Sequence, residues 1–254
     1  MAENNIKNEV LGIAWDGTGY GEDGTLWGGE FLLCTLKTYS RVFYFKPFKL
    51  LGGEKAVKEP RRVALSLMFE IFGENLPDMA FNLGFSEREV ENLFKVWKKG
   101  INSPLCSSVG RLFDAVASLI GIKHVVTYEG QAAMILEDMY KPGETSAYPF
   151  EIKDNQIDWR PILLAILEDK SKDMVPTKFI NTLIAIAHKV VELIGIERVC
   201  LSGGVMQNDP LVSGLKSSLG TAGFKVYTHR KVPPNDGGIS LGQAVWGGLY
   251  GAEL

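Results

Sequence analysis

Three apolar runs near the N-terminus predict three β-strands. Residues 10–15 form a nearly continuous apolar stretch, and residues 26–36 and 41–45 are two further runs rich in large apolar side chains. Turn-forming residues separate the three runs, and those of the first gap include four glycines. Short turns between consecutive strands favour antiparallel pairing, so we expect a three-stranded meander.

From about residue 60 the apolar period becomes helical. Residues 86–99 show this best, because Ser86 and Glu89 form a capping box and Gly100 follows the predicted helix end. One face of this helix carries four large apolar residues: Val90, Leu93, Phe94 and Trp97. Further helices are predicted from residue 61 and near 107–120 and 129–140. Residues 60–140 are therefore expected to be a mostly helical insert.

The second half of the chain alternates between strands and helices. We predict, in order, a hairpin at 148–159, helices at 161–167 and 177–194, a strand at 198–201, a turn at 202–208, a helix at 210–219, a strand at 224–228 and a helix at 236–250. The last strand–helix–strand–helix order implies parallel strands joined by right-handed crossovers. The expected fold class is α/β, with a meander, parallel strands and a helical insert in one domain over residues 1–254.

Composition narrows the possible roles. The chain has 254 residues, 46% of them apolar, enough for a substantial core. A net charge of −3 provides no broad field for binding a nucleic-acid backbone, and the apolar runs are too short to span a bilayer. The N-terminus lacks a signal-peptide pattern, and Cys34, Cys106 and Cys200 are odd in number and far apart. We therefore expect a cytoplasmic protein with free thiols and no nucleic-acid or membrane role.

Glycines cluster after two predicted strands, where backbone N–H groups can approach an anion. Asp16 follows the first strand and precedes Gly17, Thr18 and Gly19, a pattern that suits a metal-bound phosphate. It also fits a tight hairpin turn in which Asp16 caps its own backbone.

A second cluster follows the strand at 198–201. There Ser202, Gly203 and Gly204 precede Asn208 at a helix start, which fits either a nucleotide loop or a structural turn.

Two further acidic residues lie beside glycines at predicted helices. Asp236, before Gly237, could bind a cation or act only as an N-cap. Gly110 and Asp114 share a helix face on which a ribose could rest. The alternative for that pair is close helix packing, with Asp114 in a surface ion pair to Arg111 or to Lys123.

The histidines and nucleophiles show no recognised catalytic pattern. His124, His188 and His229 have no metal-ligand spacing, so a structural role is predicted for each. The sequence contains no nucleophile elbow, Walker loop or Cys–His pairing that we can identify.

In their order, six segments resemble the C-terminal region of the carbamoyltransferase HypF family. This region belongs to the Kae-like branch of the actin-like ATPase superfamily, which has a ribonuclease H-like fold. The segments include LGIAWDGTGYGEDGTLWGGEF, SPLCSSVGRLFDAVASLIGI, LSGGVMQNDPL and PPNDGGISLGQA, and together they span residues 11–31, 48–64, 103–122, 128–137, 201–211 and 233–244.

The resemblance implies transfer of a carbamoyl group from carbamoyl adenylate to the C-terminal cysteine of a HypE-like acceptor protein, in nickel-iron hydrogenase maturation. The implied cofactors are ATP or carbamoyl adenylate and a divalent metal. Asp16 and Asp236 would be the metal ligands. The residues that would line the nucleotide are Gly17, Thr18, Gly19, Gly110, Asp114, Ser202, Gly203, Gly204, Asn208 and Gly237. The attacking thiolate belongs to the acceptor, so no cysteine of this chain needs to be catalytic.

The same family places an adenylate-forming domain and a first lobe upstream of these segments. That first lobe carries a phosphate loop and an HxxxH histidine pair that complete the metal site. In addition, Ile180 occupies a position where the family usually has histidine. We therefore expect this chain to be a second lobe that is inactive alone. It is either a fragment or a separate polypeptide that must join another chain supplying the first lobe and the adenylate-forming domain. Alternatives are a non-catalytic partner-binding module and a small-molecule O-carbamoyltransferase.

Overall fold

A mixed β-sheet forms the centre of the molecule in the computed structural model. The structure describes residues 1–250, apart from the side chains of 79–81 and 250. The sheet order is β6-β7-β3-β2-β1-β8-β9, with β5 pairing to β2 and β4 to β5. The strands are β1 (Val10–Tyr20), β2 (Leu26–Cys34), β3 (Tyr39–Phe45), β4 (Phe48–Lys49), β5 (Leu105–Cys106), β6 (Glu151–Lys153), β7 (Gln156–Asp158), β8 (Arg198–Ser202) and β9 (Lys225–Tyr227).

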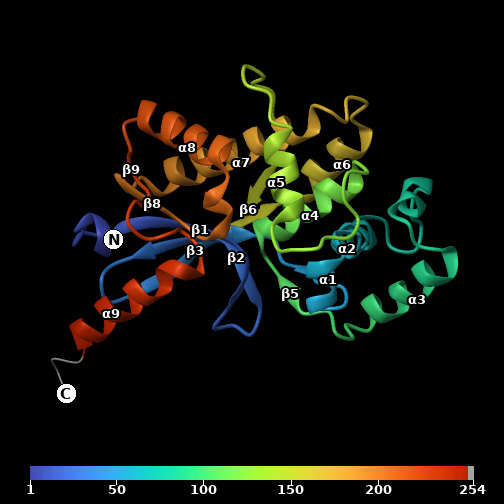
Figure 1. The fold of residues 1–254 in the computed structure, drawn as a ribbon, viewed down its shortest axis with the longest axis horizontal. Helices are drawn as coiled ribbons and strands as arrows, with labels where there is room; N and C mark the ends of the chain where they lie inside the picture. The colour runs from blue at the N-terminus through green and yellow to red at the C-terminus, as the bar shows by residue number, and fades with distance from the viewer. Residues whose placement is uncertain (251–254) are drawn as a thin grey trace.

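Most helices cover one face of this sheet, and the last helix lies on the other side (Figure 1). The α-helices are α1 (Glu54–Lys58), α2 (Pro60–Phe72), α3 (Glu87–Lys98), α4 (Val109–Leu119), α5 (Gln131–Asp138), α6 (Arg160–Glu168), α7 (Val175–Ile194), α8 (Asp209–Thr221) and α9 (Ile239–Tyr250). Short 3₁₀ turns are η1 (Ala2–Asn4), η2 (Asp78–Leu83), η3 (Gly204–Gln207) and η4 (Asp236–Gly238). Within residues 1–250, no helix combines the length and the apolar character needed to cross a membrane.

Alternation along β1 decides which residues reach each side of the sheet. Leu11, Ile13 and Trp15 are fully buried on the helix-covered face, where Trp15 makes edge-to-face contacts with Phe31 and Phe45. At the alternate positions of β1, Gly12, Ala14 and Asp16 are only half-buried. Asp16 therefore projects to the side of the sheet on which α9 lies.

The predicted strand order is largely confirmed. β1, β2 and β3 form the antiparallel meander, and β8 lies parallel to β1 on one side and to β9 on the other. Residues 60–140 are mostly helical, and the capping box of Ser86 and Glu89 is present at the start of α3. The predicted hairpin at 148–159 forms β6 and β7 and extends the same sheet through β3.

Several boundaries differ from the prediction, and two of the differences bear on the site or the insert. The glycines after Asp16 are not a loop, because β1 continues to Tyr20 and Gly19 pairs with Trp27 across an irregularity in the register. The hairpin turn lies further on, where the Gly21 N–H donates to the Thr25 carbonyl. The helix expected at 129–140 is also shorter, since α5 spans Gln131–Asp138.

Gly203 permits a close backbone crossing that a side chain would block. Its φ is +98°, and a Cβ at this position would lie 2.1 Å from the Trp15 carbonyl oxygen. We expect Gly203→Ala to lower the free energy of unfolding by about 3 kcal/mol or more, from backbone strain and overpacking together. Urea denaturation measures this effect.

Gly220 provides the matched control, because a Cβ there meets no atom within 4 Å inside α8. Gly220→Ala should raise stability by up to about 1 kcal/mol. Equal stabilities of the two variants would contradict the importance of the crossing.

Candidate functional site

Two adjoining depressions share three residues and lie beside the carboxyl end of β8 and the irregular stretch of β1 around Asp16. We call the first the α4 cleft; it encloses about 340 Å³ and its lining includes Asp16, Gly17, Gly110, Arg111, Asp114, Glu129, Gly204, Asn235, Asp236 and Gly237. We call the second the α9 groove; it encloses about 530 Å³ between the sheet and α9. Its lining includes Glu3, Asp16, Gly19, Ser202, Gly203, His229, Asn235 and Asp236. Asp16, Asn235 and Asp236 lie at the junction between the two depressions.

Hydrogen bonds fix both the backbone carbonyl and the side chain of Asp16. Its carbonyl oxygen accepts a hydrogen bond of 2.6 Å from the Ser108 hydroxyl, and the same hydroxyl caps α4 by accepting from the Arg111 N–H. One carboxylate oxygen of Asp16 accepts the N–H of Gly17 at 2.7 Å. The sequence indicates such a contact of Asp16 with its own backbone in a hairpin turn as one alternative, whereas in the structure it forms within strand β1. The fixed backbone directs the carboxylate towards the junction.

Glycines bring three backbone segments together around Asp16. A Cβ on Gly110 would lie 2.9 Å from the Gly17 Cα, so α4 begins in contact with the irregular part of β1. A Cβ on Gly204 would lie 2.9 Å from an Asp16 carboxylate oxygen. Gly110 therefore permits contact between a helix and a strand, in place of the predicted helix-to-helix packing.

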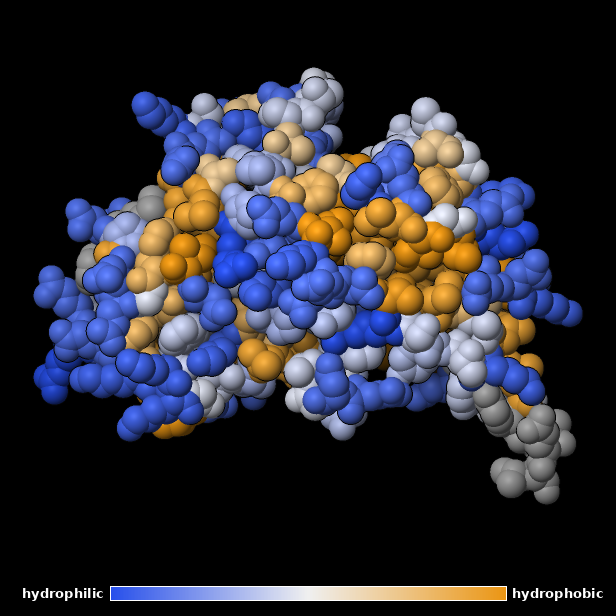
Figure 2. Space-filling model, turned by 180° about the vertical axis from the view of Figure 1, so that it is seen from behind, coloured by the Kyte–Doolittle hydropathy of each residue, from blue (hydrophilic) through white to orange (hydrophobic). Residues whose placement is uncertain are grey.

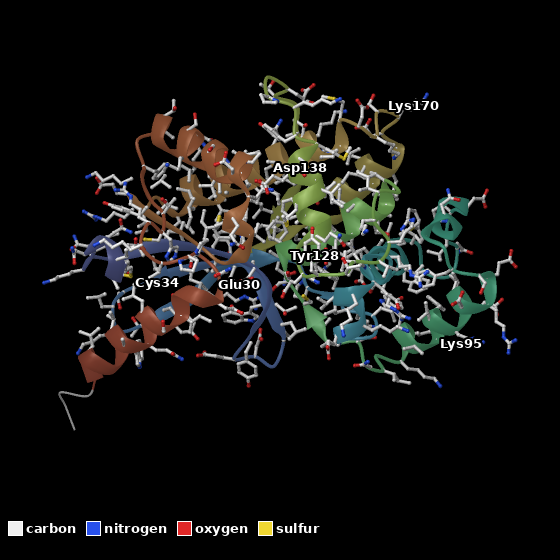
Figure 3. The ribbon with its side chains drawn as sticks, in the orientation of Figure 1. Glu30, Cys34, Lys95, Tyr128, Asp138 and Lys170 are labelled. Atoms are coloured by element: carbon white, nitrogen blue, oxygen red, sulfur yellow. The ribbon has the colours of Figure 1, made fainter. Side chains whose placement is uncertain are left out.

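Glu30 supports the same region from β2. Its carboxylate accepts the backbone N–H groups of Gly28 and Gly29 and the hydroxyl of Ser107, and it forms a 2.8 Å ion pair with Arg41. Glu30 is only 1% exposed, and Figure 3 shows it near the middle of the ribbon, far from Lys95 on α3. These contacts fix the glycine backbone that passes next to the Asp16 carbonyl.

Asp236 is not the N-cap residue. Asn235 makes the capping contact, since its side-chain oxygen accepts the N–H of Gly237 at 3.1 Å, and α9 begins only at Ile239. Asp236 is therefore not needed to cap its helix, and it lines both depressions beside Asp16.

A buried ion pair lines the α4 cleft. Arg111 Nη1 lies 2.8 Å from Asp114 Oδ2, and both side chains are less than 5% exposed. Burial raises the pKa of Asp114 to about 6; Arg111 opposes this rise, and the charge of Glu129 adds to it. The pair predicted as a surface ion pair to Arg111 is thus a buried one. Its position gives the cleft both a fixed cation and a carboxyl group.

The structure gathers most of the predicted site residues but not all of them. The α4 cleft contains seven: Asp16, Gly17, Gly110, Asp114, Gly204, Asp236 and Gly237. Gly19, Ser202 and Gly203 line the α9 groove. Thr18 is exposed on β1 and lines neither depression, and Asn208 is the buried N-cap of α8. Contact of these residues with a nucleotide stays a prediction.

Two carboxylates alone do not form a closed metal site. Within the described part of the chain, no group of three or more histidine, cysteine or acidic residues could hold an ion. Asp16 also uses one oxygen for the Gly17 N–H. Divalent metals in proteins take four or more ligands, so this donor set fits only part of a site.

Sequence reasoning missed several residues of the two depressions. Arg111 was considered only as a surface partner, and Glu129, Gln207 and Asn235 were not assigned to the site, although all four line the α4 cleft. Asn235 could have been found, because it precedes Asp236 at a helix start and asparagine is a favoured N-cap. His229 was predicted to be structural, but it lines the α9 groove, whereas His124 and His188 contact Ser118 and Ser218 outside both depressions.

Comparison with known proteins identifies the family of this fold and site. A family model described as "Carbamoyltransferase, Kae1-like Domain, second subdomain" matches residues 12–243. The chain therefore belongs to this family, and the predicted fold class and resemblance are confirmed.

The relatives themselves are named carbamoyltransferase HypF. The Synechocystis sp. protein is 43% identical over 96% of this chain, and the Rhizobium leguminosarum protein is 33% identical over 97%. A crystal structure of full-length HypF in the phosphate- and nucleotide-bound form superposes with a TM-score of 0.89 at 39% identity, covering 98% of this chain and 41% of that one. The chain spans 35% and 33% of the lengths of the two relatives.

The raised pKa of Asp114 predicts a pH-dependent stability. In the unfolded chain this carboxyl titrates near 4, so its protonated form in the folded state contributes stability that is complete below pH 4 and is lost as the pH rises through about 6. We expect Asp114→Asn to lack this loss. The stability of the variant relative to the wild type should rise by at most about 3 kcal/mol between pH 4 and pH 7. Urea denaturation across this range checks it, and a difference that does not change with pH would contradict the assignment.

Proposed function

We propose that this chain forms one half of a cleft that holds carbamoyl adenylate and transfers its carbamoyl group to a protein thiol. The supporting observation is the convergence of Asp16, Asp236 and the glycine backbone of Gly204 at one junction. Membership of the carbamoyltransferase family and similarity to a nucleotide-bound HypF support the same conclusion. The proposed acceptor is the C-terminal cysteine of a HypE-like protein in hydrogenase maturation, in the cytoplasm.

The proposed chemistry is positioning and electrostatics. In the net reaction the carbamoyl carbon becomes bonded to the acceptor sulfur, the bond from that carbon to the phosphate oxygen breaks, and AMP leaves. The α4 cleft provides Arg111 as a fixed cation, the Asp16 carboxylate is held by hydrogen bonds at its backbone and side chain, and the Asp236 carboxylate lines the same cleft. A divalent metal bound by these two carboxylates would neutralise phosphate charge when further ligands complete its coordination.

The missing ligands fit a first subdomain that docks on the α9 side. Ile239 of α9 is 53% exposed, and this helix packs mainly against the short turns η1 and η4. Figure 2 shows apolar side chains gathered on one half of the molecule, and Trp246 of α9 is 48% exposed. Large exposed apolar surfaces of this kind are typical of protein interfaces. We propose that the first subdomain and an adenylate-forming domain, supplied from outside these residues, complete the enzyme there.

Reconstituted carbamoyl transfer tests the roles of the two aspartates. The chain is combined with the upstream region of a HypF relative, and thiocarbamate on a HypE-like acceptor is measured by mass spectrometry. Asp16→Asn and Asp236→Asn should each reduce the rate by about 100-fold, the usual loss for a fixed electrostatic contact in a transition state. Asp138→Asn, at an exposed carboxylate of α5, is the control and should keep the wild-type rate. Full transfer by both aspartate variants would refute the proposed site.

A charge on α9 should prevent assembly with the upstream region. We expect Ile239→Lys to weaken this association at least tenfold by isothermal titration, since a buried apolar anchor carries a large share of binding energy. Ile101→Lys is the matched control, because Ile101 is 54% exposed but lies after α3 in the helical insert. Equal weakening by both variants would show that α9 is not the docking surface.

A further inference from the structure

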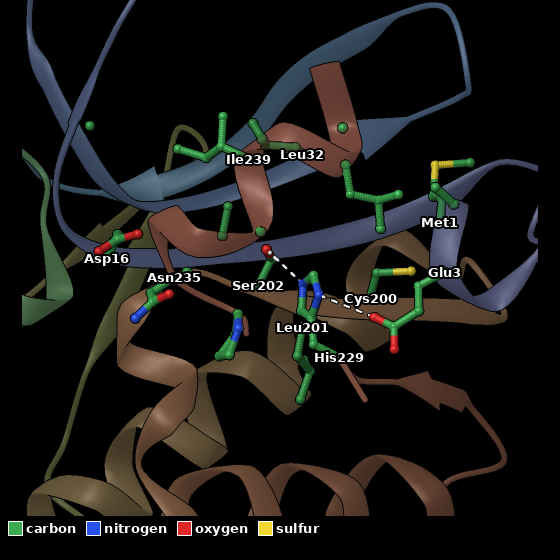
Figure 4. A pocket seen from close by; sticks show the side chains of 18 of the residues that line it. Met1, Glu3, Asp16, Leu32, Cys200, Leu201, Ser202, His229, Asn235 and Ile239 are labelled. Carbon is green, nitrogen blue, oxygen red and sulfur yellow. Dashed lines mark hydrogen bonds and ion pairs between the residues drawn. The ribbon is translucent and has the colours of Figure 1, made fainter. Parts of the chain in front are cut away.

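The α9 groove holds a serine, a histidine and a glutamate in a row. Ser202 Oγ lies 3.2 Å from His229 Nε2, and the other ring nitrogen, Nδ1, lies 3.6 Å from Glu3 Oε2 (Figure 4). Ser202 ends β8 and His229 follows the neighbouring parallel strand β9. The carboxyl edge of parallel strands is the usual place for catalytic side chains in α/β folds.

Glu3 is fixed by the loop that carries the histidine. Its Oε1 accepts the backbone N–H of Arg230 at 2.7 Å and also that of Lys231, and the neighbouring Asn4 side chain donates to the Thr228 carbonyl. Burial opposes ionisation of Glu3, but these N–H groups and the nearby His229 outweigh it and hold the pKa of the carboxyl below its usual value. Glu3 is therefore a carboxylate at neutral pH.

The facing atoms of Glu3 and His229 have no other partner. Glu3 Oε2 and His229 Nδ1 are both buried and unpaired by hydrogen bonds in the described residues, and they point at one another. A movement of about half an ångström brings them within hydrogen-bond range. Catalytic hydrogen bonds are often this long before a ligand binds. That bond places the ring proton on Nδ1 and leaves Nε2 free to accept from Ser202.

From this geometry we propose that Ser202 is a nucleophile for acyl transfer, with His229 as its general base and Glu3 as the residue that positions His229. The substrate class is a carbamoyl or short acyl group on a good leaving group, such as a phosphate. This inference rests on the proposed carbamoyltransferase function, because it adds a covalent carbamoyl-serine intermediate between the donor and the acceptor. Nucleophile, base and orienting carboxylate are the recurring parts of acyl-transfer sites.

The carbamoyl group moves in two transfers, first to Ser202 and then to the acceptor thiol. Ser202 Oγ bonds to the carbonyl carbon while its proton passes to His229 Nε2, and the bond from that carbon to the leaving phosphate breaks, giving carbamoyl-serine and a phosphate anion. The imidazolium then returns its proton to solvent. An acceptor thiol next gives its proton to Nε2, and its sulfur attacks the carbamoyl carbon. As the Ser202 Oγ–carbon bond breaks, the serine oxygen regains that proton and the neutral ring is restored.

A second set of the same residue types provides an internal control. Ser218 Oγ lies 2.7 Å from His188 Nδ1, and His188 Nε2 lies 3.3 Å from Glu192. This set joins α7 and α8 and lines neither the α4 cleft nor the α9 groove. Contact between serine, histidine and glutamate is thus common to both sets, whereas position in the groove is special to Ser202.

A fluorophosphonate probe with mass spectrometric mapping tests the proposal on the chain itself. The probe forms a phosphonyl ester with an activated serine and releases fluoride, so it needs neither adenylate nor acceptor. We expect labelling at Ser202 and not at Ser218. Labelling should disappear in Ser202→Ala and slow by about 100-fold in His229→Gln, with a smaller loss in Glu3→Gln.

Folding of each variant is checked by circular dichroism, and His188→Gln should label at the wild-type rate. Absence of a Ser202 adduct on the folded wild-type chain overturns the proposal, as does equal labelling of Ser218 or unchanged labelling in His229→Gln. These outcomes leave the carbamoyltransferase function standing, because the transfer assay with the Asp16 and Asp236 variants tests that function separately.

Discussion

The site depends on close backbone contact around Asp16. Gly110 of α4 and Gly203 after β8 each approach the backbone next to Asp16 more closely than any side chain would allow. The Ser108 hydroxyl then joins the Asp16 carbonyl to the start of α4. Because interiors are close-packed and transmit strain, a displacement of α4 or β8 would move the Asp16 carboxylate as well. Because the glycines let α4, β8 and β1 pack closely, the Asp16 carboxylate is held in a fixed position.

The two faces of the sheet differ in how completely they are covered. The face covered by α2, α4 and α7 is a conventional core, with Trp15 fully buried in it. The α9 face carries half-buried strand positions, the carboxylates and an exposed helix. The α9 face thus leaves polar and apolar groups accessible, while the opposite face is a rigid core. A cleft that is completed by docking of the proposed first subdomain requires this arrangement.

The sequence predicted the elements better than the contacts between them. Period and turn residues are local, so the meander, the β8–α8–β9 unit and the Ser86 capping box could be read directly. The glycines after Asp16 were misassigned because pairing of Gly19 with Trp27 is a tertiary choice that overrides the loop preference of glycine. The carboxylates could be named from motif resemblance. The burial of the Arg111–Asp114 pair and the pairing of Glu3 with His229 could not be predicted, because each depends on packing between segments that are distant in the chain.

A crystal structure of the chain assembled with its upstream region and a non-hydrolysable carbamoyl adenylate analogue tests the central claim most directly. We expect the phosphate of the analogue at the junction, against the Gly204 backbone and within reach of both the Asp16 and Asp236 carboxylates, with the carbamoyl group directed towards the α9 groove. An analogue bound elsewhere, with Asp16 and Asp236 both remote from its phosphate, would contradict it.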